Sequence, residues 1–233
     1  MKTIGLIGGM SWESTAVYYR LINEAVKARL GGLHSARCVL YSVDFGEIEA
    51  DRHAGGFPAI APALVRAAQA VEAAGADMVV LCTNTMHRLA GEIQSALHTP
   101  FLHIADATAA AVRARGFKRV GLLGTRFTME EDFYVGRLVR QHGLDVLIPS
   151  APERDLIHRV IYDELCLGDI RAESRAAYRQ TIERLARQGA QGIILGCTEI
   201  GLLVKPEDSP VPLFDTTELH ALAAVDEALR ASA

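Results

Sequence analysis

Short apolar runs alternate with longer amphipathic segments along the whole chain, and this alternation limits the folds open to it. The apolar runs are nearly continuous in Val, Ile and Leu, a pattern typical of strands covered on both faces of a parallel sheet. They predict strands at 3–8, 37–43, 78–81, 101–104, 119–124, 144–148, 192–196 and 212–214. The amphipathic segments predict helices at 13–30, 58–74, 86–97, 130–142 and 171–188. We therefore predict an α/β fold with doubly wound parallel sheets.

A weak internal repeat divides the chain. The segment IGLIG at 4–8 returns as VGLLG at 120–124, and GADMVVLCT at 75–83 returns as GAQGIILGC at 189–197. A looser echo of 99–106 follows at 211–215, in the same order and at nearly the same spacing. The repeat predicts two similar domains related by pseudo-twofold symmetry, each of a normal domain size. We expect one domain to contain 1–105 plus 212–233, and the other to contain 106–211.

The repeat aligns Thr83 with Cys197. Both follow the carboxyl end of a predicted buried strand, where open α/β sheets place their ligand sites. Across a cleft between two symmetric domains, the two side chains would face opposite sides of one small ligand. Such an arrangement suits removal of a proton from one face of a carbon and its return from the other. Cys82 is expected to point away, because successive strand residues face opposite ways.

The cysteine at position 197 lies in the segment Gly-Cys-Thr-Glu. A cysteine after an apolar strand is often only a small buried hydrophobic residue. Here polar neighbours surround it, and a helix is predicted to begin just beyond. A helix N-terminus stabilises a thiolate, so we expect a lowered pKa for the Cys197 thiol. Cys38 and Cys166 lie within apolar patterns and are predicted to be core residues.

Several polar segments flank the predicted strand ends. The glycine-rich stretch at 5–14 has GxxGG spacing, from Gly5 to Gly9, rather than a dinucleotide-binding motif, so the amides of its turn are better suited to a small carboxylate. Asn84 and Thr85 could cap a helix or bind a carboxylate. His87 is predicted to be structural, with a catalytic role as the alternative. Arg52, in a predicted loop, could hold a second carboxylate in its planar guanidinium. We expect substrate contacts from Met10, Ser11, Arg52, Asn84, Thr85, Thr125 and Thr198.

Composition narrows the function classes. A net charge of −4 argues against a nucleic acid or an anionic membrane as partner. The chain shows no signal peptide, no membrane-length apolar segment and no Cys/His spacing typical of a metal site. We therefore expect a cytoplasmic protein with reduced cysteines and no bound metal. None of its four lysines follows a predicted strand at the cleft, which disfavours a pyridoxal enzyme.

Six segments together resemble the aspartate/glutamate racemase family. They are GLIGGMSWEST at 5–15, the pair Asp51-Arg52, TNTMH at 83–87, GTRFTMEEDFY at 124–134, IYDELCLG at 161–168 and GCTEIGLL at 196–203. The resemblance implies two similar α/β domains with the active site between them, no cofactor, and commonly a homodimer. It also implies an amino-acid substrate, usually acidic, and a pair of cysteines as the acid/base groups.

The sequence departs from the family pattern at the first cysteine. The usual Cys-Asn-Thr is here Thr83-Asn84-Thr85, with a cysteine displaced to position 82. This resembles the branch specific for L-aspartate and L-glutamate, and it implies that Cys197 abstracts the α-proton while Thr83 helps to return one. The preferred amino acid is left open. The alternatives are a related isomerase or decarboxylase, or an amino-acid-binding protein with weak catalysis.

Overall fold

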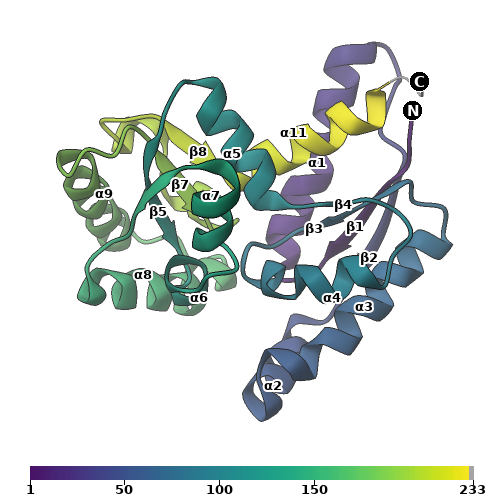
Figure 1. The fold of residues 1–233 in the computed structure, drawn as a ribbon, viewed down its shortest axis with the longest axis horizontal. Helices are drawn as coiled ribbons and strands as arrows, with labels where there is room; N and C mark the ends of the chain where they lie inside the picture. Colours follow the sequence, from purple (N-terminus) through teal and green to yellow (C-terminus); the bar gives the residue numbers. More distant parts are fainter. Residues whose placement is uncertain (231–233) are drawn as a thin grey trace. The chain divides into compact units, whose positions relative to one another are not determined.

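The structure, a computed structural model, describes residues 1–230 as two compact units (Figure 1). Unit 1 comprises Met1–His103 and the C-terminal segment from His220, and unit 2 comprises Ile104–Leu219. The chain returns from unit 2 to unit 1 at His220, inside the last helix. This boundary is later than the one after 211 that the sequence predicts. The reason is that the strand expected at 212–214 pairs within unit 2.

Unit 1 is built on a four-stranded parallel sheet with the order β2-β1-β3-β4. The strands are β1 (Ile4–Gly8), β2 (Cys38–Ser42), β3 (Met78–Leu81) and β4 (Phe101–Leu102). The central strands β1 and β3 are buried along their whole length. Ile7 lies opposite Leu81, so the segments that follow β1 and β3 leave the sheet side by side at its carboxyl edge.

The helices of unit 1 correct two expectations. They are α1 (Trp12–Leu30), α2 (Phe45–Gly55), α3 (Phe57–Ala73), a 3-10 helix η1 (Thr85–Leu89) and α4 (Ala90–Ser95). The helix predicted at 86–97 is split because the His87 ring contacts the Thr83 carbonyl, while the backbone closes tighter turns such as His87 N to Asn84 O. The loop predicted around Arg52 is instead part of α2.

Unit 2 repeats the architecture with the strand order β6-β5-β7-β8, again all parallel. The strands are β5 (Arg119–Gly124), β6 (Asp145–Leu147), β7 (Ile193–Gly196) and β8 (Leu213–Asp215). Each unit thus has its first strand next to the third, with the second and fourth at the edges. The predicted α/β class with two similar parallel sheets is confirmed.

The helices of unit 2 flank this sheet. They are α5 (Ile104–Ala114), α6 (Arg126–Glu130), α7 (Val135–His142), α8 (Ala151–Asp163), η2 (Leu165–Leu167), α9 (Ala172–Arg187), α10 (Ile200–Leu203) and η3 (Pro206–Asp208). The last helix, α11 (Thr216–Leu229), begins in unit 2 and continues from His220 in unit 1. The single helix predicted at 130–142 is wrong. The backbone is extended at Glu131, and the turn that follows carries the Tyr134 side chain into the core.

Each unit has its own apolar core. In unit 2 the core joins both faces of the sheet to α5, α8 and α9. In unit 1 the C-terminal part of α11 packs beside α1, with Ala224 and Val225 in one cluster with Tyr18 and Val80 (Figure 1). Within residues 1–230, no helix combines the length and apolar character needed to span a bilayer.

Candidate active site

Two neighbouring residues at the end of β3, Cys82 and Thr83, have side chains in different environments. Cys82 is completely buried in the apolar core with Ile4 and Val80. Burial raises the pKa of the Cys82 thiol far above its ordinary value. Thr83, the next residue, lies beyond the strand and retains slight exposure. Cys82 is therefore a core residue, as the alternation along a strand predicts.

Behind Thr83 lies a buried group of aromatic rings. The His87 Nδ1 atom is 2.7 Å from the Thr83 carbonyl oxygen. A carbonyl only accepts, so Nδ1 carries the proton in this hydrogen bond. The His87 ring packs edge-on against His103, with the ring centroids 4.5 Å apart, and also contacts His220. The contact between the His87 ring and the Thr83 carbonyl fixes the backbone that presents the Thr83 hydroxyl.

The turn after β1 lies at the same edge of the sheet. Gly9 adopts a φ of 95°, in the left-handed region, and its N–H donates to Thr15 Oγ1 at 2.9 Å. Ser11 caps α1 by accepting a hydrogen bond from Ser14 N. Because β1 and β3 are neighbours, unit 1 gathers five predicted site residues at one edge of its sheet: Met10, Ser11, Thr83, Asn84 and Thr85.

Arg52 has a different environment from the one expected. It lies in α2, whose N-terminus is capped by the Asp44 side chain. Its Nη2 atom lies 2.6 Å from Glu49 Oε2, and its Nε atom lies 3.0 Å from Glu49 Oε1. The guanidinium therefore already forms a bidentate hydrogen bond with a carboxylate of the same helix. A substrate carboxylate bound at Arg52 would share it with Glu49.

Unit 2 places its predicted site residues in the corresponding positions. Thr125 follows β5, is buried, and caps α6 by accepting from Thr128 N at 3.2 Å. Cys197 and Thr198 follow β7. Gly124 and Gly196 lie opposite each other in the sheet register, so these two segments also leave neighbouring strands. The side chain of Cys197 therefore occupies, in its unit, the position that Thr83 occupies in the other.

Cys197 is hydrogen-bonded to a carboxylate, that of Glu199, which the sequence analysis did not identify as a site residue. Its Sγ atom donates to Glu199 Oε2 at 3.0 Å, and the Thr198 hydroxyl donates to the same oxygen at 2.7 Å. Burial, together with the negative charge of Glu199, raises the pKa of the Cys197 thiol well above its ordinary value. The predicted lowering of this pKa is wrong, because α10 begins only at Ile200 and has four residues.

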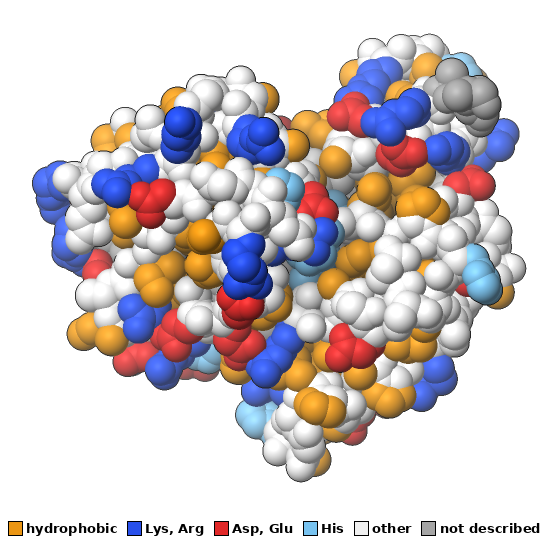
Figure 2. Space-filling model, viewed as in Figure 1, with side chains coloured by type: hydrophobic (Ala, Val, Ile, Leu, Met, Phe, Trp, Pro, Cys, Tyr) orange, Lys and Arg blue, Asp and Glu red, His pale blue; other side chains and the backbone are white. Residues whose placement is uncertain are grey.

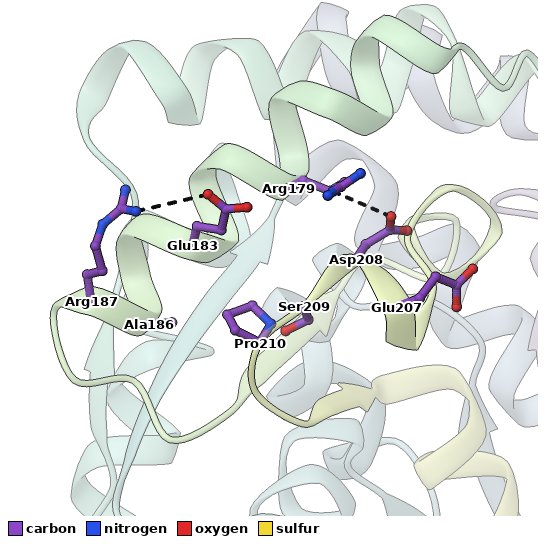
Figure 3. Close-up of a pocket in the computed structure, with 8 residues that line it drawn as sticks. All are labelled: Arg179, Glu183, Ala186, Arg187, Glu207, Asp208, Ser209 and Pro210. Atoms are coloured by element: carbon purple, nitrogen blue, oxygen red, sulfur yellow. Dashed lines mark ion pairs between the residues drawn. The ribbon is translucent and has the colours of Figure 1, made fainter.

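Other surface features lie apart from these residues. A surface pocket of about 550 Å³ is formed by α9 and the segment 207–210, and it contains none of the predicted site residues (Figure 3). Its arginines face acidic partners, with Arg179 3.8 Å from Asp208. Basic and acidic side chains are interleaved on the visible face of each unit (Figure 2). Within residues 1–230, no three His, Cys, Asp or Glu side chains are grouped to hold a metal ion.

Comparison with known proteins identifies the class. Residues 7–224 match the family model described as Asp/Glu/hydantoin racemase. A crystal structure of a candidate Asp/Glu racemase from Yersinia pestis shares 56% identity and a TM-score of 0.92, covering 99% of this chain and 100% of that one. An aspartate racemase homologue from Pyrococcus horikoshii OT3 shares 33% identity and a TM-score of 0.85, over 99% and 100% of the two chains.

A curated relative adds a functional description. The broad specificity amino-acid racemase RacX of Bacillus subtilis (strain 168) is 25% identical over 232 residues, covering 95% of this chain and 96% of its own. The fold and its matches thus define a racemase, one of the isomerases. The chain belongs to the Asp/Glu/hydantoin racemase family.

Proposed function

We propose that this protein is a cofactor-independent amino-acid racemase in which Cys197 and Thr83 act on opposite faces of the substrate Cα. One observation carries the proposal: the two side chains follow the equivalent strand, β7 or β3, in two sheets of identical strand order. Each side chain is nearly buried, and at the end of the neighbouring strand a hydroxyl residue caps the next helix: Ser11 in unit 1 and Thr125 in unit 2.

The two groups are chemically unequal. A thiol ionises near pH 8.5 in water, whereas an aliphatic hydroxyl is a far weaker acid. Cys197 is therefore the group that abstracts the α-proton, and Thr83, with a water molecule behind it, helps to return one. Acid/base chemistry of this kind contributes about 10²–10⁴-fold to the rate. The remaining stabilisation must come from groups that bind the substrate carboxylate while negative charge develops.

We assign that binding to the polar residues at the two sheet edges. The backbone amides at Met10 and Ser11, the N-terminus of α1, and the side chains of Asn84, Thr85, Thr125 and Thr198 are suited to a carboxylate. For an acidic substrate, Arg52 is the proposed partner of the second carboxylate, in competition with Glu49. The relatives named for aspartate and glutamate support an acidic substrate.

Proton exchange at Cα tests the proposal. L- and D-amino acids are incubated in heavy water, and loss of the α-proton signal is followed by NMR together with carbon dioxide release. We expect exchange without decarboxylation, abolished in Cys197→Ser and preserved in Cys38→Ala. Binding without exchange would indicate a binding protein, and release of carbon dioxide would indicate a decarboxylase.

The same assay examines the inequality of the two groups. Because the overall equilibrium of racemisation is near unity, kcat/KM must match for the two enantiomers, so asymmetry is sought in kcat and KM separately. We expect Thr83→Cys to raise kcat for the slower enantiomer. We also propose that the enzyme acts as a homodimer in the cytoplasm, where a catalytic thiol stays reduced; light scattering on the purified protein measures its mass.

A further inference from the structure

The carboxylate beside Cys197 is held in a fixed position. Glu199 is 2% exposed, and its Oε2 atom accepts hydrogen bonds from both the Cys197 thiol and the Thr198 hydroxyl. A carboxylate is costly to bury, so it persists only where donors compensate its charge. One of those donors is the thiol whose proton must leave before Cys197 can act as a base.

In the described part of unit 2, the hydrogen bonds of the other polar groups near Cys197 lead elsewhere. Tyr178 of α9 and Cys166 of η2 lie within electrostatic reach of Cys197. Glu164 lies close to Tyr178 and accepts from Ser174 Oγ, whereas Asp215 of β8 caps α11 through Thr217 N. Lys205 Nζ donates to the Gly201 carbonyl. Among the hydrogen bonds described for unit 2, the one that leaves Cys197 Sγ ends on Glu199.

We propose that Glu199 accepts the proton of the Cys197 thiol when the substrate is bound, so that the pair carries one negative charge before the α-proton is taken. This inference rests on the proposed racemase function and assigns Glu199 as a positioning residue that acts through Cys197. In the step, the S–H bond breaks as an O–H bond forms on Glu199. The thiolate then takes the substrate α-proton, and the electron pair of the broken C–H bond moves into the substrate carboxylate. Reversal of both transfers restores the pair.

In this arrangement the carboxylate of Glu199 has two effects on Cys197: it disfavours formation of the thiolate, and it accepts the thiol proton during catalysis. As a negative neighbour, Glu199 holds the pKa of the Cys197 thiol up, so its removal makes the thiolate easier to form in the open enzyme. As a proton acceptor, Glu199 takes the proton of a thiol that burial keeps protonated near neutral pH, so its removal slows α-proton exchange at any pH below the thiol pKa. A carboxylate that only stabilised the fold, or only repelled the thiolate, would not produce both effects in one variant.

The test compares Glu199→Gln with the wild type and with Glu173→Gln, which removes an exposed carboxylate at the start of α9. Iodoacetamide, a neutral reagent, reports thiolate formation at Cys197 when its peptide is quantified by mass spectrometry. We expect Glu199→Gln to be alkylated about tenfold faster for each pH unit by which the thiol pKa falls. We expect its α-exchange near neutral pH to fall about 10²-fold and to recover as pH rises, when hydroxide replaces the acceptor.

Exchange in Glu199→Gln that equals or exceeds the wild-type rate overturns the proposal, because the carboxylate would then only suppress the thiolate. Alkylation as slow as in the wild type overturns it too, since the two groups would not be coupled. Glu199→Asp guards against a folding defect: it keeps the carboxylate, and it must exchange faster than Glu199→Gln at neutral pH. A wild type that exchanges no amino acid refutes the racemase function, and the alkylation comparison still decides whether Cys197 and Glu199 are coupled.

Discussion

Adjacent residues at the end of β3 have different environments. The thiol of this segment is at position 82, in the core, and the proposed site residue at position 83 is a threonine. Cys82 lies in the core, where burial keeps its thiol protonated. We expect Cys82→Ala to lower the free energy of unfolding by about 1 kcal/mol, as a small core truncation does, and to leave α-exchange unchanged. Thermal denaturation and the NMR exchange assay measure the two effects. Loss of exchange in a folded Cys82→Ala protein would instead give Cys82 a part in catalysis.

An ion-pair cluster between α5 and α7 makes stability depend on pH. Arg137 contacts both oxygens of Asp106, at 2.6 and 2.7 Å, and His142 Nε2 lies 2.8 Å from Oδ1. Burial alone would raise the pKa of Asp106, but the Arg137 and His142 hydrogen bonds outweigh it and lower the pKa. A lowered carboxyl pKa stabilises the fold above the ordinary carboxyl range, and this contribution is lost as pH falls through the folded-state value.

We therefore expect Asp106→Asn to be less stable than the wild type at neutral pH, by about 1 kcal/mol at most because the carboxylate is partly exposed. The difference should shrink as pH falls below the ordinary carboxyl range and through the lowered pKa of Asp106, where the wild-type carboxyl becomes protonated in the folded state as well. Melting temperatures of both proteins across this pH range provide the measurement. A difference that grows in acid would have the wrong sign for this cluster.

At the scale of elements, the turn between β1 and α1 depends on a glycine for two reasons. Gly9 has a left-handed φ, and a Cβ atom there would meet the Val43 backbone. We expect Gly9→Ala to destabilise the protein by about 2 kcal/mol or more, because strain and overlap add. Gly31→Ala is the matched control: its φ of 73° is also left-handed, but nothing lies within 4 Å of the new Cβ. Equal losses in melting temperature would show that overlap at Gly9 contributes nothing.

The sequence predicted strands better than helices, for physical reasons. A buried parallel strand needs a continuous apolar run, and the prediction for 78–81 matches β3. Helix α2 was missed because its residues are largely polar and include glycine; its cap by Asp44 and its Glu49–Arg52 pair depend on side-chain geometry. The positions of Thr83 and Cys197 after their strands were predictable from the repeat. The bond from Cys197 to Glu199 was not, because residues two apart meet only in a particular backbone conformation.

At the scale of the whole molecule, we expect binding of a substrate to raise the free energy of unfolding and therefore the melting temperature. A ligand that binds only the native state adds about 2.7 kcal/mol at a concentration one hundred times its Kd. We expect L-aspartate or L-glutamate to raise the melting temperature of both the wild type and Cys197→Ser, since the serine variant loses the base but keeps the binding groups. L-Asparagine and L-glutamine are the neutral controls. A larger shift with these amides would contradict an acidic substrate.

The placement of α11 has a consequence for the synthesis of the chain on the ribosome. Lys2 N donates to the Ala228 carbonyl, Tyr18 OH lies 2.9 Å from His220 Nδ1, and Val225 belongs to the same core as Tyr18. The strands of unit 1 leave the ribosome early, but one apolar face of their sheet is covered by a helix that is translated after the strands of both units. Unit 2, whose strands all precede that helix, can complete its sheet first. A nascent chain stalled before α11 would expose this face and be a preferred client for chaperones that bind apolar surface.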